Sequence, residues 1–343
     1  MADLDLAPLR ALLHEAFGGE EAAITPMPGG ASTRKFFRAT TASGRAAVAF
    51  FVPDATRSDE IDKTDGARAR WPFLEVQALL ASRGIAVPRI LADGSRDGWL
   101  LVEDLGDDTL AQYLAARPDA RERCYQVAVR DLAAAQRALA ELPEGSVVGQ
   151  RAFDEDLLRW EIHHFREWAL EARGVTLPAA DRAIFDAVAE RLARRIASWP
   201  RGFVHRDYQS RNLMVRDEAG APALVWIDFQ DALLGPGVYD LVALLNDSYQ
   251  SFDRAFVEAR LAEYARDAGR DVDEVVREFD LVTVQRKLKD AGRFVFIDRE
   301  KGNPAFLQFV EPTIDKVRAS LARLLHEPDM RALADVLARA LPG

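Results

Sequence analysis

The sequence predicts an α+β protein with two lobes, a small antiparallel sheet followed by a larger, mainly helical part. Short apolar segments separated by Gly and Pro occupy residues 24–52 and 87–103, which is typical of strands joined by tight turns. Beyond Gly106, amphipathic stretches at helical spacing dominate. The chain of 343 residues is also longer than one hydrophobic core usually serves. We therefore expect an N-terminal lobe over residues 1–103 and a C-terminal lobe over residues 104–343.

The expected N-terminal lobe has two helices and five strands. A first helix is predicted over residues 6–17 because its apolar residues recur at helical spacing and Gly18 and Gly19 follow it. Residues 24–52 read as three antiparallel strands, and residues 54–66 as a polar loop. A second helix is expected over residues 68–82, and two further strands with the turn SRDG between them complete the sheet near Glu103.

The expected C-terminal lobe is interrupted by one β segment. Helices are predicted near residues 109–116, 119–141, 154–172 and 179–198, and again from Pro236 to the end. Residues 203–229 instead read as short strands around a turn at Gly220. The segment between the first two of these strands carries the strongest functional signal in the chain.

Composition excludes several functional classes. The 45 basic and 55 acidic residues give a net charge of −10, and no basic run is long enough to bind a polyanion such as nucleic acid. The single cysteine, Cys124, permits no internal disulfide and is best explained as a buried helix residue. The first residues are acidic, and no apolar run approaches the ~18 residues that a membrane span needs. We expect a cytoplasmic protein without a membrane or nucleic-acid partner.

Two short motifs indicate phosphoryl transfer. Residues 205–212, His-Arg-Asp-Tyr-Gln-Ser-Arg-Asn, which we call the HRD loop, precede an Ile-Asp-Phe-Gln segment by the length of a β-hairpin. In phosphoryl transfer an Asp on such a loop takes the proton of the acceptor hydroxyl, an Asn five residues later binds Mg²⁺, and a second Asp binds metal beside the ATP phosphates. The pattern assigns these roles to Asp207, Asn212 and Asp228.

A glycine-rich segment is the second signal. Gly29 and Gly30 would let backbone N–H groups approach phosphates, while Ser32, Thr33 and Arg34 would add donors. The alternative is a plain turn between two strands. Its position upstream of the HRD loop favours phosphate binding.

The segment that joins the two expected lobes is the third signal. Residues 100–106, LLVEDLG, form an apolar strand that leaves the sheet and enters the helical part. Backbone groups near Glu103 and Leu105 could bind the edge of an adenine ring. The alternative, a simple linker, is compatible with that role.

Together these segments resemble the aminoglycoside phosphotransferase and choline kinase superfamily, relatives of the protein kinases. Within it, GGASTRKFFRAT, LLVEDLGDDTL, HRDYQSRNLM, IDFQDALLGPGVYDLVALLND and VQRKLKDAG resemble the bacterial N-acetylmuramate/N-acetylglucosamine anomeric kinases of peptidoglycan recycling. The resemblance implies a bilobal protein-kinase-like fold and ATP-dependent phosphorylation of the C1 hydroxyl of an amino sugar. It also implies that Asp240 braces the HRD loop, although Asp240 could instead cap a helix.

The sequence departs from the pattern of many such kinases at one point. The third expected strand, RAAVAFFVP, lacks the lysine that clamps the ATP phosphates. Arg34 and Lys35 are the nearest substitutes, with an exposed strand residue as the alternative for each. Glu75, at the position of that lysine's usual partner, is then without a clear role and could be a surface residue of its helix.

Other readings remain open at this stage. Another small-molecule kinase, such as one acting on aminoglycoside antibiotics, or a pseudokinase that only binds nucleotide would share most of these motifs. Adjacent His163 and His164 lack the spacing of a zinc site. The polar residues of QRKLK could face the sugar or form a solvated basic surface; these are Gln285, Arg286, Lys287 and Lys289.

Overall fold

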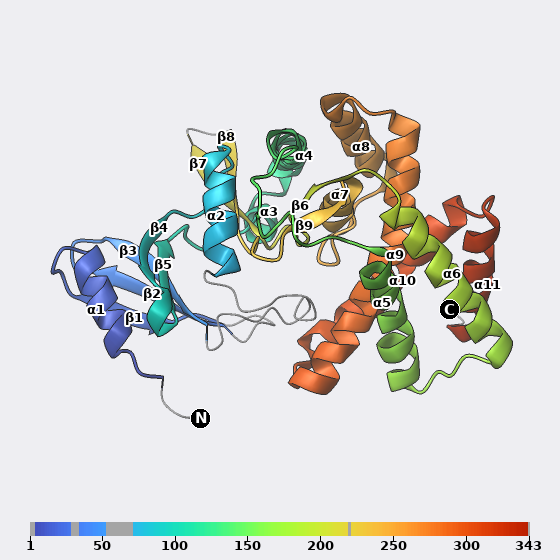
Figure 1. Cartoon of the computed structure of the whole chain (residues 1–343), viewed down its shortest axis with the longest axis horizontal. Helices are drawn as coiled ribbons and strands as arrows, with labels where there is room; N and C mark the ends of the chain where they lie inside the picture. Colours follow the sequence, from blue (N-terminus) through green and yellow to red (C-terminus); the bar gives the residue numbers. More distant parts are fainter. Residues whose placement is uncertain (1–3, 29–33, 53–70, 219–220, 342–343) are drawn as a thin grey trace.

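The computed structural model describes residues 4–28, 34–52, 71–218 and 221–341. A five-stranded antiparallel sheet lies at one end and a helical body at the other (Figure 1). The predicted α+β class, with a small sheet lobe ahead of a larger helical one, is confirmed. No helix in these described ranges is both long and apolar enough to cross a membrane.

The sheet of the N-terminal lobe has the strand order β1-β2-β3-β5-β4. Its strands are β1 (Ala22–Pro26), β2 (Lys35–Thr41), β3 (Ala46–Phe51), β4 (Ile90–Gly94) and β5 (Trp99–Glu103), and its helices are α1 (Ala7–Ala16) and α2 (Pro72–Ser82). The five strands agree with the prediction. The expected polar loop and the first residues of the expected second helix lie outside the described residues.

Strand β5 shows why the sheet has two apolar faces. Successive side chains of a strand point to opposite faces, and here every position of a four-residue run is apolar. Trp99 and Leu101 pack with the α1 residues Leu9 and Leu13 on one face. Leu100 and Val102 pack on the other face, beside α2.

Helix α2 connects the sheet to the rest of the molecule and lies between the five-stranded sheet and the helical body (Figure 1). The ring of Phe73 stacks on Phe229, with centroids 4.9 Å apart. The carboxylate of Glu75 accepts a 2.6 Å hydrogen bond from the backbone N–H of Val147. Glu75 is therefore no surface residue, because it joins α2 to a loop of the C-terminal lobe.

The C-terminal lobe contains nine described α-helices and two small sheets. The helices are α3 (Leu110–Ala116), α4 (Arg121–Ala138), α5 (Glu155–His164), α6 (Ala179–Ala197), α7 (Val238–Leu245), α8 (Arg254–Ala268), α9 (Val272–Lys301), α10 (Val310–Arg323) and α11 (Pro328–Ala340). Strand β6 (Arg201–Val204) pairs with β9 (Leu233–Pro236), and β7 (Leu213–Glu218) pairs with β8 (Ala221–Trp226). The sequence did not predict β9, and the helix expected over 154–172 is α5 followed by a π-helix, Phe165–Leu170.

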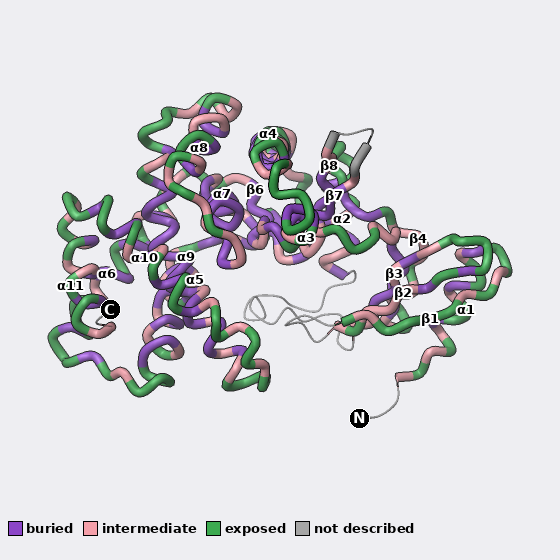
Figure 2. The backbone as a smooth tube through the Cα atoms, turned by 180° about the vertical axis from the view of Figure 1, so that it is seen from behind, coloured by how far each residue is buried: buried purple, intermediate pink, exposed green. Residues whose placement is uncertain are grey.

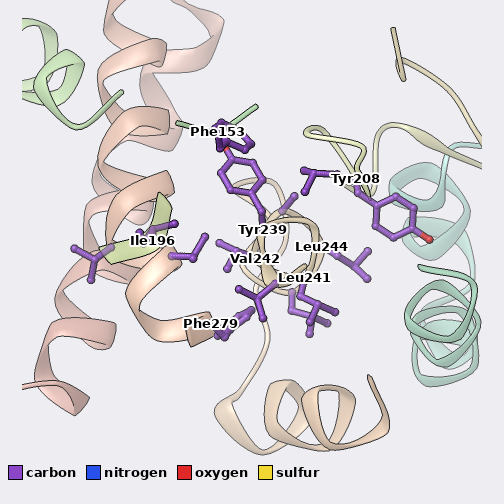
Figure 3. Packing of buried hydrophobic residues seen from close by; sticks show 14 of the residues in the cluster. Phe153, Ile196, Tyr208, Tyr239, Leu241, Val242, Leu244 and Phe279 are labelled. Atoms are coloured by element: carbon purple, nitrogen blue, oxygen red, sulfur yellow. The ribbon is translucent and has the colours of Figure 1, made fainter. Parts of the chain in front are cut away.

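Helices α7 and α9 form the centre of this lobe, as the burial pattern shows (Figure 2). Every residue of α7 is buried. The ring of Phe153 packs on Tyr239 at 4.2 Å between centroids, beside the apolar side chains of α7 (Figure 3). Helix α9 passes so close to α5 that a Cβ atom at Gly292 would lie 2.5 Å from the carbonyl oxygen of His164. This packing fixes the positions of the polar side chains that α7 and α9 carry.

Candidate active site

The HRD loop connects β6 to β7 and is held in a strained backbone conformation. Arg206 has φ 80° and Asp228 has φ 64°, and among the described residues these two are the non-glycine positions with positive φ. Side chains rarely adopt this left-handed region, which costs about 1–3 kcal/mol unless surrounding structure enforces it. Arg206 directly precedes the predicted base Asp207, and Asp228 is itself one of the predicted metal ligands.

Asp240 enforces the conformation at the start of the HRD loop. Its two carboxylate oxygens accept hydrogen bonds from the backbone N–H groups of His205, at 2.7 Å, and Arg206, at 2.9 Å. Burial raises the pKa of Asp240 to about 7, although these two bonds and Arg286 act in the opposite direction. The N-cap position of α7 belongs to Gly237. Asp240 therefore braces the loop, as the resemblance implied, and does not cap the helix.

Asp247, which the sequence analysis did not single out, holds the other end of the loop. One of its oxygens accepts a 2.9 Å hydrogen bond from the backbone N–H of Ser210, and the other accepts one of 2.9 Å from Tyr249. The hydroxyl of Ser210 donates to the same carboxylate. An acid two residues after a mostly apolar helix was the only signal for this residue in the sequence.

The structure brings Asp207, Asn212 and Asp228 together. The side-chain nitrogen of Asn212 lies 2.9 Å from the carbonyl oxygen of Asp207 and 3.5 Å from a carboxylate oxygen of Asp228. Desolvation raises the pKa of Asp228; the nearby Arg34 lowers it, and the charge of Asp207 raises it further. A cation placed here would relieve this repulsion.

These residues fit a magnesium ion. Because the amide nitrogen of Asn212 is bonded to the Asp207 carbonyl, its amide oxygen is the atom left for a cation. That oxygen and the carboxylate of Asp228 are the hard oxygen ligands that Mg²⁺ prefers. Among the described residues, Asn212, Gln230 and Arg34 contact the carboxylate of Asp228, and each of these side chains could move aside without breaking a strand or helix.

Helix α9 supplies a buried cation to the site. Arg286 donates from Nη1 to the carbonyl oxygen of Arg206, at 2.7 Å, and from Nη2 to Oδ1 of Asp207, at 3.3 Å. The side chain of Arg286 is 2% exposed, whereas that of Asp207 is 34% exposed and accessible to an acceptor. The predicted alternative of a solvated basic surface is wrong, since all four residues in question are buried: Gln285, Arg286, Lys287 and Lys289.

Comparison with known proteins agrees with this geometry. The family model described as "Phosphotransferase enzyme family" matches residues 23–279. This chain belongs to that family. It is 34% identical over 282 residues to the N-acetylmuramate/N-acetylglucosamine kinase of Pseudomonas aeruginosa, covering 79% of this chain and 78% of that protein. It is 31% identical over 328 residues to the protein of the same name in Pseudomonas putida, covering 93% and 89%.

A solved structure shows the fold. The GDP complex of wild-type aminoglycoside 2'-phosphotransferase-IIIa aligns with 94% of this phosphotransferase and all 100% of its own chain, with a TM-score of 0.61. The two share 13% sequence identity. At that identity the likeness establishes the common fold alone. The family match and the two N-acetylmuramate/N-acetylglucosamine kinases confirm the predicted resemblance to this superfamily and to its amino-sugar kinases.

The structure describes some of the predicted nucleotide-binding residues of this family member. Arg34 lies at the site, with Nη1 3.5 Å from Oδ1 of Asp228, whereas its neighbour Lys35 is exposed. Four predicted residues fall outside the described part of the chain: Gly29, Gly30, Ser32 and Thr33. Arg34 and Lys35 are the two candidates to replace the missing strand lysine, and the geometry favours Arg34.

The last residue of β5, Glu103, is held by a backbone hydrogen bond and an ion pair. Glu103 donates its backbone N–H to the carbonyl oxygen of Arg89, at 2.9 Å, and its carboxylate pairs with Arg216 at 2.5 Å. Leu105 is half-buried. The N–H of Glu103 is therefore engaged in the sheet, and an adenine edge would have to use its carbonyl group or the backbone of Leu105.

Proposed function

We propose that this chain is a kinase that transfers the γ-phosphoryl group of ATP to the C1 hydroxyl of N-acetylmuramate, N-acetylglucosamine or both. The grouping of Asp207, Asn212 and Asp228 at the strained HRD loop carries this proposal. The relatives named for these two sugars, at 31% and 34% identity, support the choice of acceptor. The product, a sugar 1-phosphate formed during cell-wall sugar recycling, would arise in the cytoplasm.

In the proposed reaction the C1 oxygen attacks the γ-phosphorus of ATP. The bond between the γ-phosphorus and the bridging oxygen breaks, ADP leaves, and the hydroxyl proton passes to the carboxylate of Asp207. Because Arg286 binds Oδ1 of Asp207, the second oxygen is left for that proton. A modest base suffices, since an anomeric hydroxyl is more acidic than an ordinary alcohol. Asp207 also orients the acceptor.

The nucleotide would lie between the lobes, residues 1–103 and 104–343. Its phosphates would contact the segment from Gly29 to Arg34, and its base the backbone at Glu103 and Leu105. Asn212 and Asp228 would hold Mg²⁺, which neutralises charge that develops on the phosphoryl oxygens. Arg34 replaces the absent strand lysine as the cation beside the phosphates.

A phosphoryl-transfer assay on a small acceptor panel tests this proposal. The panel contains N-acetylglucosamine, N-acetylmuramate and kanamycin, with ³¹P NMR to identify the phosphorylated position. We expect an anomeric phosphate on one or both amino sugars and no turnover of kanamycin. Transfer to kanamycin alone would make the chain an aminoglycoside kinase. Nucleotide binding without transfer to any acceptor would make it a pseudokinase.

A further inference from the structure

Arg211 is a cation of the HRD loop that phosphoryl transfer itself does not require. Its guanidinium carbon lies 3.6 Å from the centroid of the Tyr249 ring and 5.7 Å from that of Phe309. A guanidinium stacked in this way keeps its N–H groups along its edge, where they can donate to a carboxylate. Arg211 is also exposed to solvent.

Asp247 fixes Arg211 and Tyr249 relative to each other. Its carboxylate binds the backbone N–H of Ser210, the residue before Arg211, and the backbone N–H of Tyr249, each at 2.9 Å. The aromatic ring and the arginine therefore rest on a single buried anchor. Arg211 belongs to the HRD loop that also carries Asp207, and Tyr249 lies in the segment between α7 and α8.

The acids of the site lie within electrostatic range of this stacked pair. Burial raises the pKa of Tyr249 to about 12; Arg211 acts against this rise, while Asp290, Asp247 and Asp207 add to it. Three acids thus act on the Tyr249 ring, in a chain with a net charge of −10. An anionic acceptor would be repelled there unless a cation were available to bind it.

Two other basic side chains near Asp207 already bind acidic partners. Arg286 binds Asp207, and Lys287 donates to Asp290 at 2.8 Å and to Ser248 at 3.2 Å. Burial would raise the pKa of Asp290, but Lys287, Arg286 and Lys289 outweigh it and hold that pKa well below its usual range. Among the residues that the structure describes, no carboxylate pairs with Arg211.

We propose that Arg211 binds the carboxylate of an acidic amino-sugar acceptor and so determines the preference for N-acetylmuramate over N-acetylglucosamine. This inference rests on the proposed function. The two sugars share the ring, the N-acetyl group and the C1 hydroxyl, and they differ in the lactyl ether of the muramate, which carries a carboxylate. A guanidinium supplies paired N–H donors that match a carboxylate.

Three substrates separate charge recognition from a structural role. They are N-acetylmuramate, its methyl ester, which keeps the lactyl shape without the charge, and N-acetylglucosamine. The variants are Arg211→Gln and Arg211→Lys. Arg117→Gln is the matched control, because Arg117 is likewise exposed and stacks on a tyrosine ring, with its guanidinium carbon 4.6 Å from the Tyr113 centroid.

In Arg211→Gln, kcat/KM for N-acetylmuramate should fall at least ~10-fold, the loss of one charge-assisted contact. The values for the ester and for N-acetylglucosamine should stay within about twofold, as should all three values in Arg117→Gln. Arg211→Lys should retain an intermediate activity on N-acetylmuramate, because it keeps the charge without the paired donors. The melting temperature of each variant checks that it is folded.

The opposing outcomes are distinct. An equal loss on all three substrates would mean that Arg211 supports the loop rather than the carboxylate, and unchanged kinetics would mean that it does neither; both overturn the inference. A wild-type enzyme that phosphorylates the acid and the ester equally, or N-acetylglucosamine alone, also overturns it while the proposed function stands. A wild-type chain that phosphorylates neither sugar refutes the proposed function itself.

Discussion

The guanidinium of Arg286 bonds both the side chain of Asp207, at 3.3 Å, and the backbone carbonyl of Arg206, at 2.7 Å. It lies over the ring of Tyr239, with its central carbon 4.6 Å from the centroid. A helix that begins 65 residues after Asp207 thus orients the proposed catalytic carboxylate and supports the strained residue before it.

Replacing Arg286 should impair turnover more than substrate binding. In Arg286→Gln we expect kcat to fall at least ~10-fold while KM for ATP changes little, because the misplaced Asp207 acts on the acceptor and not on the nucleotide. Arg286→Lys should recover part of kcat. Arg277→Gln is the control on the same helix, since Arg277 is exposed and pairs with Glu327. Normal kcat in a folded Arg286→Gln enzyme would refute the orienting role.

Removing a proposed metal ligand should change the magnesium requirement. In Asp228→Asn the concentration of Mg²⁺ for half-maximal activity should rise at least ~10-fold, since one anionic ligand is lost. Asp273→Asn, at an exposed position in the first turn of α9, is the control. A Mg²⁺ titration of activity at saturating ATP makes the comparison. An unchanged titration curve would mean that Asp228 does not bind the ion.

Arg34 and Lys35 can be tested as a pair, because they are adjacent in sequence but differ in position. Arg34 lies 3.5 Å from Asp228, whereas Lys35 is exposed. We expect Arg34→Gln to raise the KM for ATP about tenfold and Lys35→Gln to leave it nearly unchanged. The reverse result would assign the phosphate contact to Lys35.

The sequence predicted those parts of the fold that leave a local pattern. The apolar run from Trp99 to Val102 and the spacing of Asp207, Asn212 and Asp228 are local, and the structure contains both the strand and the cluster. Strand β9 has no such pattern, because it is four residues long, contains Gly and Pro, and pairs with a strand that begins 32 residues before it.

The role of Arg286 could not be predicted from its surroundings in the sequence. A run of three cations and a glutamine is typical of a solvated helix face, but α9 is buried on several sides and has no single apolar stripe. Arg286 differs from Lys287 in its partner. Arg286 bonds Asp207, which is 79 residues away in the chain. Only the tertiary packing supplies this information.

His205 should make the protein sensitive to acid. Burial lowers the pKa of His205 to about 4, while the charge of Asp207 acts against this, and Nδ1 of the neutral ring accepts a hydrogen bond from the backbone N–H of Asp207. The unfolded chain binds a proton near the ordinary value of about 6.5. Between these two values the unfolded state holds the extra proton, so the free energy of unfolding should fall as the pH falls, by up to about 3 kcal/mol.

Urea unfolding at pH 6.5 and pH 4.5 measures this loss. The loss of unfolding free energy should be smaller in His205→Asn, because asparagine keeps a side-chain acceptor but cannot titrate. The control is His326→Asn, at an exposed histidine, in which the loss should equal that of the wild type. If wild type and His205→Asn lose the same stability, the acid sensitivity arises elsewhere.

The central claim is tested most directly with the Asp207→Asn variant. The measurement is its rate of phosphoryl transfer from ATP to N-acetylglucosamine or N-acetylmuramate. The amide has nearly the shape of the carboxylate but cannot take the acceptor proton, so we predict a rate at least ~100-fold below that of the wild type, with the Kd for ATP nearly unchanged. A variant that transfers phosphate at close to the wild-type rate would contradict the assignment of Asp207 as the base.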